Sequence, residues 1–139
     1  ATYLFSNDYE DGLITQKTGW SHEEILQRVA VRVITRGAKG SSVEIAGEPR
    51  LDIPVAREVA RVDPTGVGDA YRAGFLAGLA WKVPLERCAQ LGSLLATYAI
   101  EVIGTQEYRF DGTFLTRFED AYGAAAGAQI APHLDQLKL

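Results

Sequence analysis

Asp63-Pro64-Thr65-Gly66-Val67-Gly68-Asp69 is the most informative stretch of this sequence, because it lies where a predicted strand leads into a helix that opens at about Gly68. Gly66 and Gly68 allow the backbone to turn sharply with several N–H groups pointing the same way. The new helix adds its unpaired amides and the positive end of its dipole. These features predict an anion site that suits a phosphoryl group, with the Asp69 carboxylate in the first turn to accept a proton from an attacking hydroxyl.

A simpler interpretation of the same loop stays open, in which Asp63 and Asp69 are only capping residues around an ordinary turn. Two other phosphate-binding patterns are excluded. No Gly-Lys-Ser/Thr follows the glycines, and Tyr71 stands where the dinucleotide-binding fingerprint needs its third glycine. The loop alone therefore leaves anion binding and capping as equal alternatives.

Around this loop the sequence predicts strands that alternate with helices, followed by a helical C-terminal part. Polar residues at Ser6-Asn7-Asp8 start the first helix and Gly19 ends it, while Ser21 with Glu24 forms a capping box for the second. The predicted strands are 1–5, 31–35 and a hairpin of 42–45 and 50–54, and the later predicted helices are 68–81, 85–103, 113–126 and a weak one at 129–139 around Pro132. This order indicates the α/β class, with the sheet covered on at least one face.

The composition is that of one ordinary folded domain, with 139 residues, 47% hydrophobic and 23% charged. The formal net charge of −4 argues against a protein that binds nucleic acid by neutralising phosphates. The apolar stretch 73–81 is too short to cross a membrane. Residues 1–5 have no basic leader and run directly into a polar loop, so we do not expect a signal peptide there. With the single Cys88, no internal disulfide forms, so we expect a reducing, cytoplasmic setting.

The chain contains no methionine, not even at position 1, and opens on residues that read as the middle of a strand. We therefore expect residues 1–139 to be a piece of a longer protein.

Three motifs, in order along the chain, resemble those of the ribokinase (PfkB-type) family of small-molecule kinases. The stretch from Asp63 to Phe75 is similar to the family's C-terminal signature, Asn7-Asp-Tyr-Glu10 to its Asn-x-x-Glu motif, and Thr35-Arg-Gly-Ala-Lys-Gly40 to its Thr-x-Gly-x-x-Gly nucleotide loop. The resemblance runs from residue 2 to about residue 126 and corresponds to the C-terminal half of a family member. It implies a ribokinase-like α/β fold, here the C-terminal part of a sheet flanked by helices in a truncated domain.

The resemblance also implies roles for the residues of the three motifs. Asp69 would be the catalytic base, and the anion hole for the transferred phosphoryl group would comprise Gly66, Val67 and Gly68. Asn7 and Glu10 would organise Mg²⁺ and phosphate through water, whereas a helix N-cap and a first-turn acid would explain these two residues if they stood alone. The ATP phosphates and ribose would be lined by Thr35, Gly37, Lys39 and Gly40.

For the adenine, the resemblance implies walls formed by Ser93, Ala96 and Gly104. Close helix packing is an alternative role for the small residues of these helices, among them Gly74, Gly78 and Gly92. After Gly104 this chain has Thr-Gln-Glu-Tyr, whereas many family members have Gly-Ala-x-x-Ser there and hold a monovalent cation. The departure disfavours a potassium site.

The combined motifs are more similar to the family's bacterial adenosine kinases than to its sugar kinases. The implied activity is ATP-dependent phosphorylation of a primary hydroxyl, converting adenosine to AMP. A sugar kinase of the same family and a non-catalytic nucleotide-binding fragment remain as alternatives. Residues 1–139 would be the nucleotide-binding half, inactive alone because the acceptor-binding part and lid lie elsewhere. The implied partners are ATP and a small substrate, either adenosine or a sugar. Binding to nucleic acid or to a membrane is not expected. The oligomeric state is open, with a homodimer as one option.

Overall fold

The structure is a computed structural model that describes residues 3–55, 67–101 and 112–135. It divides into two compact units, Ala1–Pro54 and Val55–Leu139, which are treated separately below.

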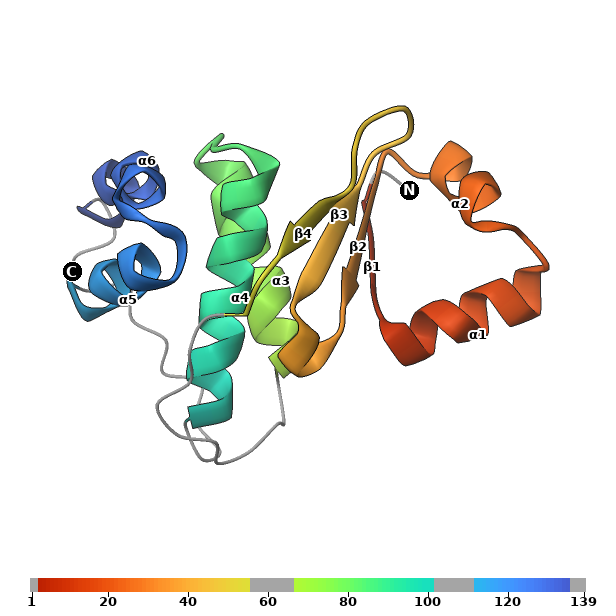
Figure 1. Cartoon of the computed structure of the whole chain (residues 1–139), viewed down its shortest axis with the longest axis horizontal. Coiled ribbons are helices and arrows are strands. Elements are labelled where there is room, and N and C mark those ends of the chain that lie inside the picture. The colour runs from red at the N-terminus through yellow and green to blue at the C-terminus, as the bar shows by residue number, and fades with distance from the viewer. Residues whose placement is uncertain (1–2, 56–66, 102–111, 136–139) are drawn as a thin grey trace. The chain divides into compact units, whose positions relative to one another are not determined.

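The first unit is built on a four-stranded sheet with the strand order β1-β2-β3-β4 (Figure 1). Its strands are β1 (Tyr3–Asn7), β2 (Val31–Thr35), β3 (Ser41–Glu44) and β4 (Leu51–Ile53). β1 and β2 are parallel, and the other two neighbouring pairs are antiparallel. The predictions for β2 and for the β3–β4 hairpin are confirmed to within a residue at each end. β1 continues two residues beyond its predicted end, because Ser6 and Asn7 still pair with β2.

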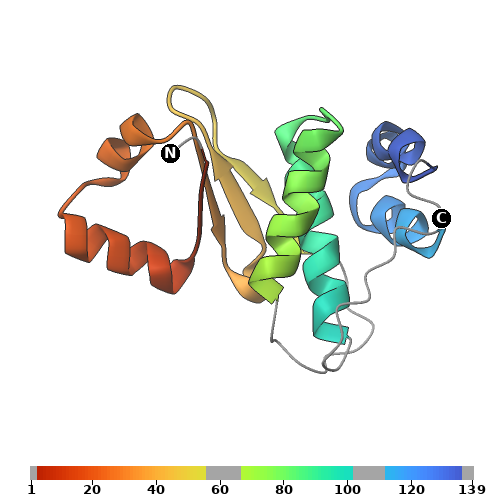
Figure 2. The same cartoon turned by 180° about the vertical axis from the view of Figure 1, so that it is seen from behind.

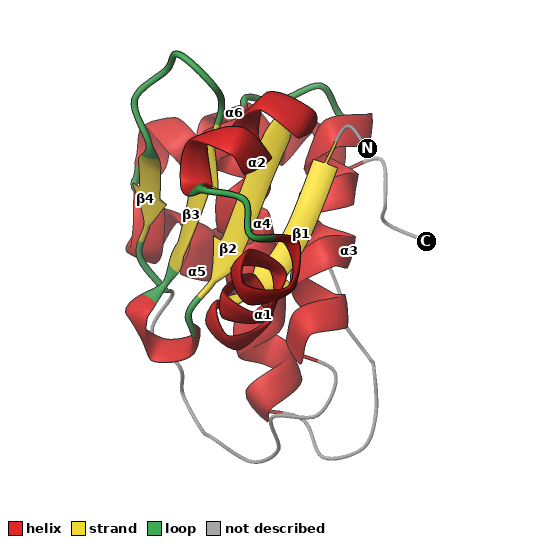
Figure 3. Cartoon of the chain, turned by 90° about the vertical axis from the view of Figure 1, so that its right-hand side faces the viewer, coloured by secondary structure: helices red, strands yellow, loops and turns green. Residues whose placement is uncertain are grey.

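Two helices, α1 (Asp8–Thr18) and α2 (His22–Arg28), connect β1 to β2 and lie on the same face of the sheet (Figures 1 and 3). The predicted end signals are confirmed. Gly19 ends α1 in the left-handed conformation at φ 70°, and its N–H donates to the Thr15 carbonyl at 3.0 Å. Ser21 caps α2, with the reciprocal hydrogen bonds of a capping box to Glu24.

A cluster of charged side chains ties these helices to the sheet. Arg32 of β2 is only 1% exposed, and its guanidinium pairs with Asp11 of α1 and contacts His22 at the start of α2. His22 in turn contacts Glu44 of β3, which is the register partner of Arg32. A buried guanidinium is tolerated only with partners of this kind. His22, to which the sequence assigned no chemical role, is therefore one of the contacts that hold α2 on the sheet, although its side chain is 52% exposed.

The second unit begins with two helices, α3 (Val67–Ala80) and α4 (Leu85–Glu101), which lie side by side (Figures 1 and 2). Glycines make the close approach possible. A Cβ on Gly74 would lie 2.6 Å from the Leu91 carbonyl oxygen, and one on Gly92 would lie 2.7 Å from the Tyr71 carbonyl oxygen. The helix-packing interpretation of these small residues is confirmed.

The core of this unit gathers apolar residues from four helices. Its buried members are Ala70, Leu91, Leu94, Leu95, Phe114, Phe118, Ala126, Ile130 and Leu134. Along the described parts of the chain, no helix is both long enough and apolar enough to cross a membrane.

The predicted helix boundaries at the C-terminus are wrong. Instead of one helix over 113–126 and a weak one after it, the structure has α5 (Gly112–Tyr122) and α6 (Ala124–Asp135). Gly123 separates them, because its φ of 98° is left-handed and its N–H closes α5 on the Glu119 carbonyl at 2.8 Å. α6 continues through Pro132, whose missing N–H removes one helical hydrogen bond without ending the helix.

Candidate active site

Two of the sequence motifs meet at the carboxyl ends of β1 and β2 in the first unit. Asn7 ends β1 and Thr35 ends the parallel strand β2, and the two are register partners although 28 positions separate them in sequence. In α/β sheets, ligands bind beyond the carboxyl ends of parallel strands. The structure therefore places the Asn-x-x-Glu motif and the glycine loop side by side where such a ligand would bind.

At this edge, Asn7 and Glu10 hold each other in place. Asn7 Oδ1 accepts a hydrogen bond from the Glu10 N–H at 2.7 Å, and Glu10 Oε1 accepts one from the Asn7 N–H at 3.0 Å. Both residues are exposed at the start of α1, so the capping interpretation is confirmed. A carboxylate accepts several hydrogen bonds, and Mg²⁺ keeps most of its water when it binds through one or two carboxylates. The Glu10 carboxylate thus fits an ion held through water.

The loop after Thr35 is a compact turn, η1 (Gly37–Lys39), closed by its own backbone. The Arg36 N–H donates to the Gly40 carbonyl at 2.8 Å, and the Gly40 N–H donates to the Gly37 carbonyl at 3.0 Å. Gly37 has φ 57° and open space where a side chain would stand, and Lys39 is exposed. This part of the loop leaves its outer side open to a ligand.

Gly40 differs from Gly37 in its surroundings. Its φ is 86°, it is buried, and a Cβ there would lie 2.2 Å from the Ile53 carbonyl oxygen of β4. The glycine at position 40 is therefore required by the packing of the loop on the sheet. Arg36, which sequence reasoning missed, anchors the same loop by donating to Ser42 Oγ at 2.8 Å. Its position between the motif residues Thr35 and Gly37 was the signal that could have indicated this role.

The start of α3 carries the candidate base of the second unit. Asp69 is the third residue of the helix and its side chain is 78% exposed. Arg72, one turn further on, places Nη1 3.9 Å from Asp69 Oδ1. Gly68 has open space around the position of a Cβ. Of the predicted anion hole, Val67 is described only as the first helical residue and Gly66 lies outside the described residues.

The residues predicted to line the adenine are placed in α4. Ser93 and Ala96 are buried there, and Ser93 hydrogen bonds to the Tyr122 side chain of α5. Burial is the main cause that raises the pKa of Tyr122. Ser93 thus has a packing partner within its own unit, and its contact with adenine stays a prediction. Gly104 lies outside the described residues, and so do residues 105–108, whose sequence disfavours a potassium site.

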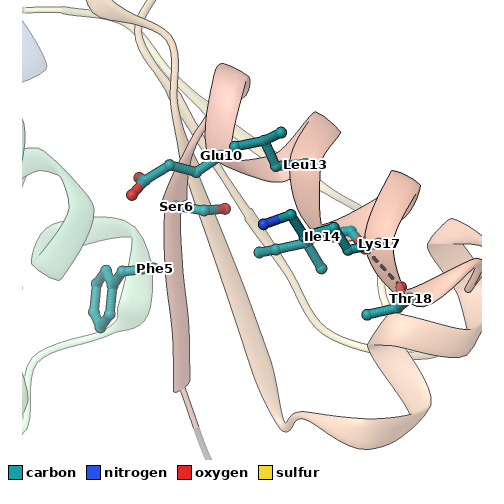
Figure 4. Close-up of a pocket in the computed structure, with 7 residues that line it drawn as sticks. All are labelled: Phe5, Ser6, Glu10, Leu13, Ile14, Lys17 and Thr18. Atoms are coloured by element: carbon teal, nitrogen blue, oxygen red, sulfur yellow. Dashed lines mark hydrogen bonds between the residues drawn. The ribbon is translucent and has the colours of Figure 1, made fainter.

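A pocket of about 420 Å³ opens between β1 and α1 (Figure 4). It is lined by Phe5, Ser6, Glu10, Leu13, Ile14, Lys17 and Thr18. The lining is largely apolar, and only Glu10 among the predicted site residues contributes to it. The pocket therefore lies between β1 and α1, and no residue of the predicted nucleotide loop lines it.

The remaining reactive groups of the described residues do not form a second centre. Burial raises the pKa of the Cys88 thiol to about 11, so it stays protonated and is a poor nucleophile at neutral pH. Within the described ranges, no three His, Cys, Asp or Glu side chains gather in a way that could hold a metal ion.

Comparison with known proteins decides the family. The sequence matches the pfkB family of carbohydrate kinases over residues 1–109, which is most of the chain. The chain belongs to the pfkB family. This pfkB chain is 33% identical over 104 residues to a nucleoside kinase of Methanocaldococcus jannaschii, and the match covers 75% of the chain but 34% of that protein. It thus spans about a third of the length of this curated relative.

Solved structures agree with this assignment. A nucleoside kinase of Burkholderia thailandensis in complex with inosine matches 88% of the pfkB chain with a TM-score of 0.83 and 39% identity, over 40% of its own length. An adenosine kinase from Sinorhizobium meliloti matches 74% of the chain and 32% of its own length, with a TM-score of 0.65 and 30% identity. The predicted ribokinase-like α/β fold and the predicted family are both confirmed.

Proposed function

We propose that this chain is the C-terminal, nucleotide-binding half of an ATP-dependent kinase that transfers a phosphoryl group to the 5′-hydroxyl of a nucleoside, with adenosine as the first candidate. The observation that carries the proposal is the pairing of Asn7 with Thr35, which brings the Asn-x-x-Glu motif and the glycine loop to the same end of two parallel strands. This is where an α/β sheet binds a phosphorylated ligand.

The motif residues of each unit have their own proposed role. The outer side of the loop at Gly37 and Lys39 receives the ATP phosphates, and Glu10 holds Mg²⁺ through water. When bound, Mg²⁺ neutralises charge that develops on the phosphates. The backbone amides of Gly66, Val67 and Gly68 would hold the transferred phosphoryl group.

Asp69 is the proposed general base. Its exposed carboxylate takes the proton of the acceptor hydroxyl as that oxygen forms a bond to the γ-phosphorus, and the bond from phosphorus to the departing ADP oxygen breaks. An exposed carboxylate on the first turn of a helix can approach a hydroxyl without rearranging the fold. The acceptor-binding part and the lid are proposed to lie outside these 139 residues.

A nucleoside is preferred to a free sugar because the Burkholderia thailandensis and Methanocaldococcus jannaschii matches are both nucleoside kinases. The inosine in the first of these structures supports a purine base. The family description as carbohydrate kinases keeps a sugar such as ribose as the second candidate.

A substrate comparison tests this choice. With ATP and Mg²⁺, we expect the complete protein to phosphorylate adenosine or inosine with kcat/KM at least about tenfold above that for ribose or fructose, because contacts to the base add binding energy that a free sugar lacks. Initial rates with the four acceptors measure this. Equal or higher kcat/KM with a sugar would replace the nucleoside proposal by the sugar kinase.

The magnesium role of Glu10 can be separated from its capping role. Glu10→Gln keeps the capping box, since Gln is also accepted there, but removes the charge that attracts the ion. We expect the half-saturating Mg²⁺ concentration for turnover to rise about tenfold, with a free energy of unfolding within about 0.5 kcal/mol of the wild type.

Glu24→Gln is the matched control, because Glu24 holds the same position in the capping box of α2. It should change neither the Mg²⁺ requirement nor the stability. If Glu10→Gln behaves like Glu24→Gln in both measurements, Glu10 is a capping residue alone.

A further inference from the structure

Helix α3 carries two charged residues, Asp69 and Arg72, and both lie toward its amino end. A basic residue stabilises a helix at the carboxyl end, where it complements the dipole. The last turn of α3 has no basic residue. The position of Arg72 is therefore not explained by the stability of the helix.

The ion pair itself also contributes little to stability. Arg72 Nη1 lies 3.9 Å from Asp69 Oδ1, beyond the length of a hydrogen bond, and the two side chains are 48% and 78% exposed. Exposed pairs of this kind are weak, since water screens both charges. Helical side chains also lean toward the amino end, so the guanidinium of Arg72 extends over the turn that carries Asp69.

The proposed reaction determines which groups of the substrate approach the Arg72 guanidinium. An acceptor oxygen that gives its proton to Asp69 must lie within about 3 Å of the carboxylate. After transfer, the phosphoryl group is bonded to that same oxygen. The phosphoryl oxygens are then close to the Asp69 carboxylate, whose Oδ1 lies 3.9 Å from Arg72 Nη1. A guanidinium presents five donors in a fork that suits phosphate.

We propose that Arg72 binds the phosphoryl group as it reaches the acceptor oxygen, and that it offsets the repulsion between the phosphorylated product and Asp69 once this carboxyl has released the proton that it accepted. This inference rests on the proposed function. It makes Arg72 a catalytic residue that recognises the phosphate of the product rather than the nucleoside.

Equilibrium binding to the complete protein tests the proposal without turnover. Calorimetry would compare each nucleoside with its 5′-monophosphate, as the pairs adenosine with AMP and inosine with IMP. We expect Arg72→Gln to weaken monophosphate binding at least about tenfold while nucleoside affinity stays within twofold, because only the phosphate loses a charged hydrogen bond. Arg72→Lys keeps the charge but loses the planar fork, so its loss should be smaller.

Arg50→Gln is a matched control, because Arg50 is 49% exposed and pairs with a carboxylate, Asp52, at 2.8 Å. It should leave all affinities unchanged. Asp69→Asn should have the opposite sign to Arg72→Gln and tighten monophosphate binding, since it removes a repulsive charge.

Two results would overturn the inference: unchanged monophosphate affinity in both Arg72 variants, or an equal loss for nucleoside and monophosphate. Either can occur while Asp69→Asn still lowers kcat at least about a hundredfold, which would leave the proposed kinase intact. Normal turnover in Asp69→Asn would instead refute the proposed function itself.

Discussion

Asp69→Asn is expected to lower kcat at least about a hundredfold in the complete protein while the affinity for ATP changes by no more than a few-fold. Asn has the size of Asp and keeps most of its capacity to cap a helix, but it does not accept the proton of the acceptor hydroxyl. The side chain is 78% exposed, so the substitution disturbs no packing. Steady-state kinetics and calorimetry with ATP measure the two quantities.

Asp52→Asn is the control for this experiment. Asp52 is 70% exposed and pairs with an arginine two residues away, yet it lies on β4, away from all three motifs in the sequence. It should leave kcat unchanged. Near wild-type turnover in Asp69→Asn, with nucleosides and with sugars, would make Asp69 a helix-start residue and remove the chemical centre of the proposed mechanism.

The second large effect is expected at Gly40. Gly40→Ala should lower the free energy of unfolding by about 2–5 kcal/mol, because the residue has a left-handed φ and its new Cβ would lie 2.2 Å from the Ile53 carbonyl oxygen. Urea-induced unfolding followed by tryptophan fluorescence measures the change. Since the Ile53 carbonyl oxygen belongs to the backbone, the clash is not relieved by a side-chain rotation.

Two matched glycines separate strain, clash and ligand binding. Gly37→Ala and Gly47→Ala also place a side chain at positive φ, but each has open space around the Cβ, so both should cost about 1–2 kcal/mol of stability. Only Gly37→Ala should weaken ATP binding, because its backbone lies in the proposed nucleotide loop. Equal ATP affinities in these two variants would remove that role from the loop, and equal stability of all three would contradict the packing role of Gly40.

The local elements were predictable because their signals lie within a few residues. The capping box of Ser21 and Glu24 and the left-handed Gly19 marked helix ends that the structure confirms. Gly123 carries the same kind of signal, yet the helix predicted over 113–126 runs through this residue, and that prediction is wrong. A glycine inside an amphipathic pattern is ambiguous from sequence, because helix packing and helix termination both favour it.

The candidate site was predictable only as separate motifs. Nothing in the sequence indicated that Gly37 faces open space while Gly40 faces Ile53, because that contrast depends on where β4 packs. Arg32 gave a partial signal, since an arginine inside an apolar strand is unusual, but its partners Asp11 and Glu44 come from other elements. The pair of Asp69 and Arg72 differs from these cases, because residues three positions apart on one helix lie close together, and this spacing can be read from the sequence.

The sequence by itself determined the strands of the first unit, the caps of its helices and the residues of the three motifs, because alternation, capping and glycine act over a few positions of the chain. Only the tertiary structure decided that Asn7 lies beside Thr35 and that Arg32 is enclosed by charged partners. Both outcomes depend on strand register and on which face of the sheet the helices cover. Those are set by the burial of apolar surface between distant segments, for which a local pattern carries no instruction.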